Sequence, residues 1–227
     1  MTKIHNWEIP TSLLINLEQI PVDQPVALLL RHSVRDEIPP GETGNEVPIT
    51  DAGKDIALKL GQKLGARLKS LHSSPLTRCV QTAEALRFGS GVDTSIAENR
   101  ILGDPGVYVL DDHLAWSNWE TLGHEEVMRH LVAESEALPG MAQPDKAARF
   151  LVQCMLSSAD GAPGIHVFVT HDVLVTATVA RLQGVRHEPD DWPLFLEGAL
   201  FWRSKLGVHV VYRDSAHLAV SEEFITI

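Results

Sequence analysis

The chain has few cysteines, no surplus of positive charge and no long apolar run, and each shortage excludes a class of protein. Two cysteines in 227 residues, Cys79 and Cys154, do not make a disulfide framework and are expected to stay reduced. A formal net charge of −11 argues against a nucleic-acid partner, because phosphate backbones attract basic surfaces. No apolar run is long enough for a membrane span, and the N-terminal residues lack a signal-peptide core. We therefore expect a soluble, cytoplasmic protein without a membrane partner.

The histidines also lack the spacing that a metal site needs. None of the eleven stands in a His-Glu-x-x-His pattern or a similar ligand spacing, so we expect no metal. A small anionic partner is still compatible with the acidic chain, because a local cluster of arginines can dominate one pocket. The hydrophobic fraction of 44% is ordinary for a globular protein and sufficient for a sizeable core. No feature of the sequence indicates an oligomeric state.

Apolar, strand-like runs alternate along the chain with segments of helical periodicity. Thr50 is suited to cap a helix, and apolar residues recur at every fourth position after it. This alternation predicts a mostly parallel sheet covered on both faces, and a late hairpin makes the sheet mixed. We therefore predict an α/β fold, a three-layer α/β/α sandwich. The expected strands are 25–30, 68–73 and 165–170, with hairpin strands 199–203 and 208–213, and the expected helices are 50–68, 77–86 and 173–182.

The middle of the chain, from about residue 93 to residue 160, is less regular. Gly103 to Gly106 has the composition of a turn, which suits a break between ordered segments. We predict a single domain over residues 1–227, in which the middle region is a helical or irregular cap insertion. The helices expected within it are 120–136 and 146–156.

Charged residues follow the first predicted strand at once. Arg31 and His32 stand at its end, and Arg35 comes three residues after His32. Arginine stays charged and presents a planar fork of donors that matches a phosphate group. Arg78 falls in the first turn of a predicted helix, where free backbone N–H groups also favour anions, and His171 follows another predicted strand. The pattern indicates an anion site at one edge of the sheet.

A histidine between arginines is suited to attack phosphorus. Its neutral imidazole can form a phosphohistidine, which divides one difficult step into two easier ones. His32 is the better nucleophile because arginines flank it, and His171 would then donate a hydrogen bond to the phosphoryl group. The leaving oxygen needs a proton, which a carboxylic acid usually supplies. In order of preference, the candidate acids are Asp172, Glu98 and Asp104. Two of them also have structural alternatives, since Asp172 is suited to cap the next helix and Glu98 to pair with Arg100.

Four short motifs occur in a fixed order along the chain. They are Arg31-His32-Ser33, then Ile49-Thr50-Asp51-Ala52-Gly53, then Ser73 through Ala83, and finally Val167-Phe168-Val169-Thr170-His171. In this order they resemble the histidine phosphatase superfamily, which includes phosphoglycerate mutases, fructose-2,6-bisphosphatases, acid phosphatases and phytases. The corresponding family patterns are Arg-His-Gly, Leu-Thr-x-x-Gly, Ser-Ser-Pro-Leu-x-Arg-x-x-x-Thr-Ala, and a histidine after a strand. The resemblance extends from about Val26 to Arg203 and is weakest between Tyr108 and Ala162.

The resemblance assigns roles to individual residues. It implies that His32 is the phosphorylated nucleophile, that Arg31 and Arg78 are phosphate ligands, and that His171 is a further pocket residue. It also implies that the protein uses neither a metal nor an organic cofactor.

The chain combines features of two branches of that family. Arg35, as a further phosphate ligand, and the His171-Asp172 pair resemble the acid phosphatase and phytase branch, in which the aspartate is the proton donor. The mutase branch takes its acid from a glutamate after the second helix, and Glu98 lies near that place. Ser33 replaces the family's glycine at a position of close backbone approach, where its side chain is either tolerated or narrows the pocket.

The leading interpretation is a phosphatase that hydrolyses a small-molecule phosphomonoester through a phosphohistidine. The first alternative is a phosphomutase of the phosphoglycerate mutase type, which needs basic residues in the cap to hold a second anionic group. Only Arg129 is basic between Asp104 and Asp145, so the mutase is disfavoured. The second alternative is a non-catalytic module that binds a phosphate ligand on the same fold. Trp116 and Trp119 are expected either to pack in the cap or to line a substrate pocket.

Overall fold

The computed structural model describes most of the chain. The cap expected over 93–160 is included apart from residues 134–135 and 160, which lie outside the described residues. The described ranges are 7–38, 44–133, 136–159, 161–185, 187, 191–215 and 218–220.

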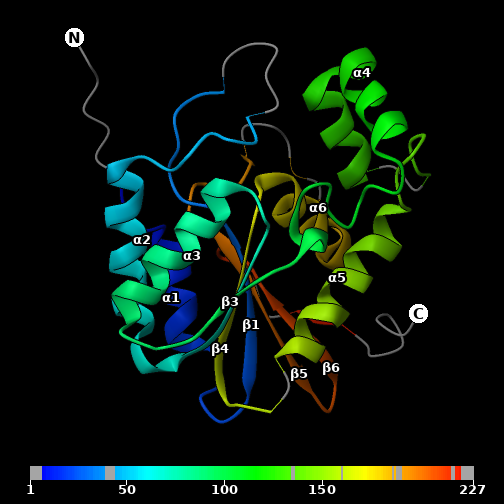
Figure 1. Cartoon of the computed structure of the whole chain (residues 1–227). Helices are drawn as coiled ribbons and strands as arrows, with labels where there is room; N and C mark the ends of the chain where they lie inside the picture. Colours follow the sequence, from blue (N-terminus) through cyan, green and yellow to red (C-terminus); the bar gives the residue numbers. More distant parts are fainter. Residues whose placement is uncertain are drawn as a thin grey trace.

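A seven-stranded mixed sheet, in the order β3-β2-β4-β1-β5-β6-β7, forms the centre of the molecule (Figure 1). Strands β1 to β4 pair in parallel, whereas β5, β6 and β7 add antiparallel strands at one side. Residues 26–30 of β1 are fully buried because helices cover both faces of this strand. The expected parallel strands and the late hairpin are thereby confirmed. The strands are β1 (Pro25–Arg31), β2 (Leu68–Ser73), β3 (Ile96–Glu98), β4 (Gly164–Thr170), β5 (Gly198–Ser204), β6 (Gly207–Val211) and β7 (Leu218–Val220).

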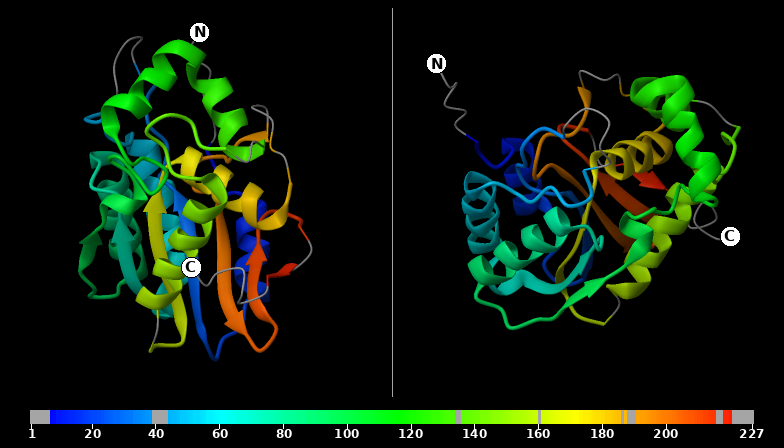
Figure 2. Two further views of the ribbon diagram at one scale, coloured as in Figure 1. Left: turned by 90° about the vertical axis from the view of Figure 1, so that its right-hand side faces the viewer. Right: turned by 45° about the horizontal axis from the view of Figure 1, so that its top comes forward.

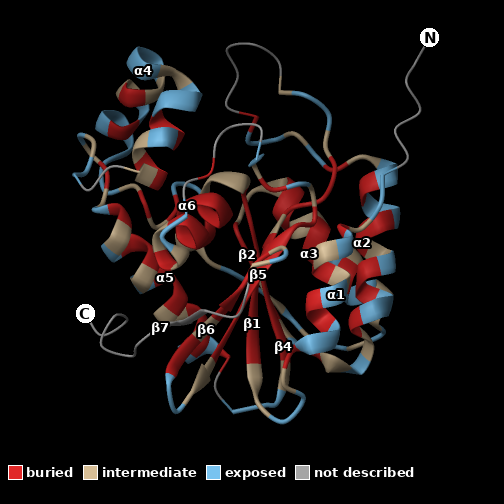
Figure 3. Cartoon of the chain, turned by 180° about the vertical axis from the view of Figure 1, so that it is seen from behind, coloured by how far each residue is buried: buried red, intermediate tan, exposed pale blue. Residues whose placement is uncertain are grey.

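Helices cover both faces of the sheet, which confirms the predicted three-layer α/β/α fold (Figures 1 and 2). Successive side chains of a strand point to opposite faces. Accordingly, Leu28 and Leu30 of β1 join the apolar cluster under α1, α2 and α3, whereas Ala27 and Leu29 join the cluster under α5 and α6. Figure 3 shows the buried residues gathered on the strands and on the inner helix faces. The helices are α1 (Thr11–Gln19), α2 (Asp51–Leu64), α3 (Thr77–Ser90), α4 (Asp112–Ala133), α5 (Pro144–Ser158) and α6 (Asp172–Gln183).

Helix α2 begins where the sequence predicts and ends earlier. The Thr50 hydroxyl accepts a hydrogen bond from the Gly53 N–H at 3.0 Å, which confirms Thr50 as the N-cap. The helix was expected to continue to about Leu68, but it ends at Leu64. The next residue, Gly65, has a φ of 49°, a left-handed conformation that favours glycine and stops the helix. A short 3-10 turn then leads into β2.

The cap above the sheet is narrower than predicted. Helix α4 lies beyond the ends of β1 and β4, with a kink at Gly123, whose φ is 78° (Figures 1 and 2). Its first turns, from Asp112 to Trp119, were not expected as helix. In contrast, β3 is an edge strand of the central sheet. Helix α5 buries a full apolar face against this sheet. Both belong to the sandwich although they fall within the predicted insertion of about 93–160.

An additional short helix, α1, precedes the first strand. The sequence did not predict α1, a short helix that buries Leu13 and Leu17 against the sheet. Within the described part of the chain, no helix has the length and apolarity that crossing a membrane requires.

Candidate active site

Two parallel neighbouring strands bring the two predicted histidines together. β1 and β4 end in register, with Arg31 opposite Thr170, so His32 and His171 both emerge at the same edge of the sheet. Their ring centroids lie 5.6 Å apart in an edge-on arrangement. The backbone N–H of His32 donates to the carbonyl of Thr170 at 2.8 Å and fixes this junction. The sequence pattern of an apolar run followed by a histidine therefore located both residues correctly.

His32 is held with one ring nitrogen free to react. The residue is 2% exposed, and its Nδ1 lies 2.8 Å from the backbone carbonyl oxygen of Ser33. A carbonyl only accepts hydrogen bonds, so Nδ1 carries the proton and Nε2 keeps its lone pair. Burial, together with the neighbouring His171 and Arg31, holds the pKa of His32 well below its usual value. The imidazole is therefore neutral near pH 7.

His171 is fixed in the opposite tautomer. Its Nδ1 accepts a hydrogen bond from an Nη of Arg78 at 3.2 Å, so its Nε2 carries the proton and donates to the Ser74 hydroxyl at 3.0 Å. Burial and the charge of Arg78 lower the pKa of His171 to about 3. Gly103, whose φ is 145°, packs directly against this ring. A Cβ on Gly103 would lie 2.5 Å from Nε2 of His171.

Three arginines contribute positive charge around His32. Arg78 is 7% exposed in the first turn of α3, where its Nη1 donates to the carbonyl of Gly44 at 2.7 Å. Arg35 is half-buried and donates to the carbonyl of Asp36 at 2.7 Å. Among the described residues, the buried Nε–H groups of Arg31, Arg35 and Arg78 have no hydrogen-bond partner. Burial lowers the pKa of Arg31 and Arg78, as expected for cations drawn partly out of water. Such a cluster favours an anion that carries several acceptor oxygens.

Arg31 is held on three sides. One Nη forms an ion pair with Asp172 at 2.9 Å, and the other donates to the carbonyl of Pro193. The guanidinium also lies over the ring of Phe195, 4.2 Å from its centroid. Arg31 itself does not line the cavity described below, although it was expected to contact the anion directly. It positions Asp172, which does line that cavity.

Ser33, the departure from the family pattern, points away from the site. The residue is fully buried, and its hydroxyl donates to the carbonyl of Gly53 at 2.6 Å. Gly53 is required there, because a Cβ would lie 2.3 Å from the carbonyl oxygen of Val34. The serine side chain thus links the turn after β1 to the start of α2 by a hydrogen bond. The sequence left open whether the Ser33 side chain is tolerated or narrows the pocket. The structure shows that it is tolerated and does not narrow the pocket.

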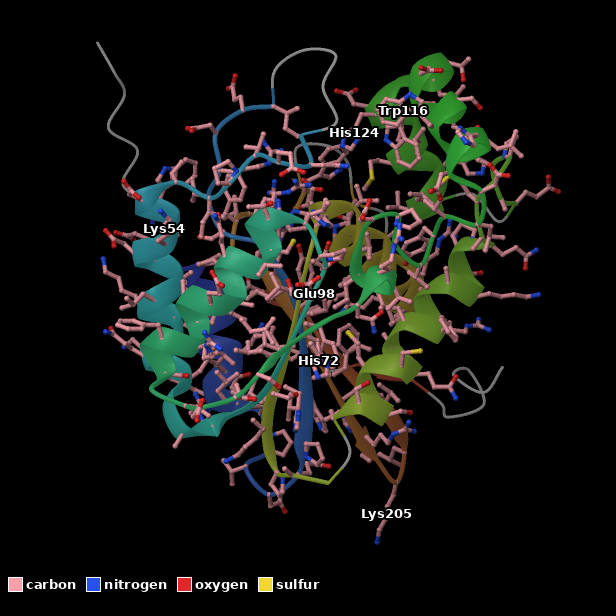
Figure 4. The ribbon with its side chains drawn as sticks, in the orientation of Figure 1. Lys54, His72, Glu98, Trp116, His124 and Lys205 are labelled. Carbon is pink, nitrogen blue, oxygen red and sulfur yellow. The ribbon has the colours of Figure 1, made fainter. Side chains whose placement is uncertain are left out.

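A cavity of about 510 Å³ lies over these residues. His32, His171, Arg35, Arg78 and Asp172 form one side of it. The opposite side comes mainly from the cap, and Figure 4 shows Trp116 and His124 on α4 above the ends of the strands. The cavity volume is in the range of small-molecule sites.

The candidate acids differ in their position. Asp172 lines the cavity as the first residue of α6, one residue earlier than the predicted helix start, and its Oδ1 accepts from the Val173 N–H at 2.9 Å. Burial alone would raise its pKa, but the charge of Arg31 and this N–H outweigh burial and hold the pKa of Asp172 below its usual value. Asp104 also lines the cavity, whereas Glu98 is exposed on β3 and does not (Figure 4). Arg100 pairs with Asp104 at 3.8 Å instead of with Glu98.

Sequence reasoning missed several residues that shape the site. Gly103 was noted only as part of a turn, and Phe195 carried no signal because a lone aromatic residue after an irregular segment is common. Ser74 belongs to a recognised motif, yet its hydrogen bond to His171 depends on the parallel pairing of β2 and β4. In the part of the chain that the structure describes, no group of three His, Cys, Asp or Glu residues is arranged to hold a metal ion.

Comparison with known families agrees with this geometry. A family model described as the histidine phosphatase superfamily (branch 1) matches residues 27–194, which is well over half of the chain. The chain belongs to the histidine phosphatase superfamily. No curated protein matches the chain.

Solved structures of histidine phosphatases share the fold at low sequence identity. A mycobacterial glucosyl-3-phosphoglycerate phosphatase is 18% identical, with a TM-score of 0.54 over 85% of this chain and 100% of its own. A phosphoserine phosphatase from Entamoeba histolytica is 14% identical, with a TM-score of 0.56 over 84% of this chain and 96% of its own. The ecdysone phosphate phosphatase from Bombix mori is 17% identical, with a TM-score of 0.53 over 88% of this chain and 97% of its own.

Proposed function

We propose that this protein is a phosphatase that hydrolyses a small-molecule phosphomonoester through a phosphohistidine on His32. The observation that carries the proposal is the tautomer of His32. Its Nδ1–H is bound to the carbonyl of Ser33, so the free Nε2 lone pair belongs to a buried, neutral imidazole beside cationic side chains. The similar solved structures include phosphatases for glucosyl-3-phosphoglycerate, phosphoserine and ecdysone phosphate, which supports the same class of reaction here.

The arginines supply the charge that the phosphoryl group requires. A phosphoryl group in transfer spreads negative charge over three oxygens, and fixed donors around it lower the barrier. Arg78 and Arg35 line the cavity, and their buried Nε–H groups have no partner within the described part of the chain. His171 lines the same side and is kept in one orientation by Arg78 and Ser74.

Asp172 is the acid that we assign to the leaving oxygen. It lines the cavity, and its ion pair with Arg31 links it to the phosphate side of the site. A monoanionic phosphate ester, the form present below a pH of about 6, brings one proton with it. Its negative charge lies in the cavity that Asp172 lines, and this like charge raises the affinity of the carboxyl group for that proton. The carboxyl group is then ready to protonate the departing alcohol.

The reaction then proceeds in two displacements. Nε2 of His32 attacks phosphorus, the bond from phosphorus to the ester oxygen breaks, and that oxygen takes the proton of Asp172. Water next attacks the phosphohistidine while the Asp172 carboxylate accepts a proton from it. The phosphorus–nitrogen bond breaks, and inorganic phosphate leaves with His32 restored.

The decisive experiment replaces the nucleophile. His32→Ala should abolish hydrolysis of p-nitrophenyl phosphate, whereas His113→Ala should behave like the parent because His113 is exposed and does not line the cavity. Rapid acid-free quenching of the parent with radiolabelled substrate should trap label that is stable to base and labile to acid. Equal hydrolysis by His32→Ala and the parent, or label bound elsewhere, would exclude the mechanism.

A further inference from the structure

The half of the cavity opposite His32 is built from apolar and aromatic side chains. We call five of them the cap wall, because they belong to α4 and to the segments that flank it. Three members are almost completely buried and therefore hold fixed positions, whereas Trp116 is 48% exposed at the mouth. The cap wall consists of Tyr108, Trp116, Trp119, Leu131 and Met141.

The polar atoms of the aromatic residues in the cap wall are already bonded within the protein. A tyrosine hydroxyl or an indole N–H that is satisfied in this way leaves the ring itself to face a ligand. The cap wall therefore offers ring faces and aliphatic groups rather than hydrogen-bond donors. The bonds join Tyr108 to Thr178 at 3.0 Å, Trp116 to Glu120 at 2.9 Å and Trp119 to His124 at 3.3 Å.

Positive charge is confined to the His32 side of the cavity. Of the described lysines and arginines, only Arg35 and Arg78 line it, and both belong to the phosphate side. Arg129, the only arginine of α4, pairs on the exposed helix surface with Glu126 at 3.1 Å. A carboxylate or second phosphate on the organic part of a substrate would thus lose water without gaining a cation. Asp104, at the same cavity, would repel it.

One polar group of the cap remains available. Trp119 donates to Nδ1 of His124, so this nitrogen is an acceptor and the ring proton is on Nε2. His124 lines the cavity from above (Figure 4). Its Nε2–H suits a hydroxyl, ether or carbonyl oxygen, which are uncharged acceptors.

We infer that the preferred substrate is the phosphate monoester of an uncharged, ring-bearing alcohol, whose ring packs on the cap wall. This inference rests on the proposed function, since the phosphate must face His32 for the ring to reach the cap. A site of about 510 Å³ accommodates a phosphate together with an organic group of that kind. The same lack of cap cations disfavours transfer between phosphoglycerates.

The first test compares monoesters whose leaving groups are all primary alcohols, so that intrinsic reactivity is nearly constant. The set is 3-phenylpropyl phosphate, glycerol 3-phosphate, phosphoserine and 3-phosphoglycerate. The kcat/KM for 3-phenylpropyl phosphate should exceed that for 3-phosphoglycerate at least about tenfold, the effect of one well-packed aromatic contact. An equal or higher kcat/KM for either carboxylate-bearing ester would overturn the inference and leave the phosphatase assignment intact.

Variants of the cap wall separate ring packing from general loss of structure. Trp116→Ala should lower kcat/KM for 3-phenylpropyl phosphate about tenfold and leave glycerol 3-phosphate nearly unchanged. Trp119→Phe should retain more activity on the phenylpropyl ester than Trp119→Ala. Phe88→Ala removes an exposed ring at the end of α3, outside the cavity, and should match the parent on both esters. A uniform loss on both esters in Trp116→Ala would contradict a ring contact.

A binding measurement distinguishes failure of the inference from failure of the proposed function. Calorimetry on His32→Ala, which needs no turnover, should show tighter binding of 3-phenylpropyl phosphate than of 3-phosphoglycerate. If 3-phenylpropyl phosphate binds more tightly but the parent hydrolyses no ester, the proposed phosphatase function is refuted and the ligand class is supported. If 3-phosphoglycerate binds more tightly and the parent is active, only the ligand class is refuted.

Discussion

Arg31 and Asp172 form an ion pair at the edge of the site, with 2.9 Å between Nη2 and Oδ2. The pair joins the last residue of β1 to the first residue of α6, and little solvent reaches either side chain. Removing one partner of such a pair leaves a poorly solvated charge, so the two residues depend on each other. An anion bound in the cavity, which Asp172 lines, disfavours the charged carboxylate and raises its affinity for a proton. Phosphate binding and the proton affinity of the carboxyl are thereby coupled.

This coupling predicts a selective defect in Asp172→Asn. The amide has no acidic proton to give, so kcat/KM for 3-phenylpropyl phosphate, which reports the steps up to departure of the alcohol, should fall about 10²- to 10³-fold. The kcat/KM for p-nitrophenyl phosphate should fall much less, because p-nitrophenolate leaves without protonation. Steady-state kinetics on both esters measures the difference.

Glu98→Gln is the matched control, because Glu98 is exposed and does not line the cavity. It should match the parent on both esters. A defect in Glu98→Gln or Asp104→Asn that is larger on the alkyl ester than the defect in Asp172→Asn would reassign the proton donor.

The lowered pKa values of the two histidines predict an activity that persists in weak acid. A base whose pKa is lowered loses its proton at lower pH, so His171, with a pKa of about 3, stays neutral as pH falls from 7 to 5, and His32 takes up a proton only at lower pH than an ordinary histidine. For an unperturbed histidine, with a pKa of about 6.5, the fraction in the neutral form would fall about 25-fold between pH 7 and pH 5. The kcat/KM for p-nitrophenyl phosphate should therefore change far less than that.

The measurement is a pH–rate profile in buffers of constant ionic strength, with circular dichroism to show that the protein stays folded at pH 5. A fall of about 25-fold between pH 7 and pH 5 in a folded protein would mean that His32 titrates as if exposed to water.

Ser33 is predicted to stabilise the fold without taking part in the reaction. Ser33→Ala removes the hydrogen bond to the Gly53 carbonyl at 2.6 Å, which should lower the free energy of unfolding by about 1 kcal/mol. The kcat/KM should stay close to that of the parent because the hydroxyl points away from the cavity. Urea denaturation and phosphatase kinetics on the same sample test both expectations. Normal stability combined with a large loss of kcat/KM would show that the hydroxyl acts on the site.

The residues at strand ends could be predicted from the sequence, whereas contacts between separate segments could not. An apolar run fixes where a strand stops, so His32 and His171 were expected at one sheet edge. The direction of the Ser33 side chain depends on how α2 approaches the turn after β1, which sequence periodicity does not encode. Arg31 was expected to bind the phosphate, but it forms an ion pair with Asp172. Because Asp172 begins the helix that follows the neighbouring strand β4, sequence spacing could not predict this contact. Likewise, the aromatic cap wall exists only because the kinked α4 folds over the ends of β1 and β4.

Gly103 gives the sharpest test of how the site is positioned. A Cβ there would lie 2.5 Å from Nε2 of His171, so Gly103→Ala must displace a ring that Arg78 and Ser74 hold in place. A displacement of about 1 Å at a catalytic site costs about 100-fold in rate, and we expect a loss of kcat of that size.

Alanine is also strained at the φ of 145° of Gly103, and this effect must be separated from the contact. Gly161→Ala is the matched control, because Gly161 also has a φ beyond the αL region, 111°, but a Cβ there meets no atom within 4 Å. Thermal denaturation should show that both variants are moderately destabilised by backbone strain. Only Gly103→Ala should lose activity at a temperature where both are folded. An equal activity loss in the two variants would mean that strain, and not the contact with His171, is responsible.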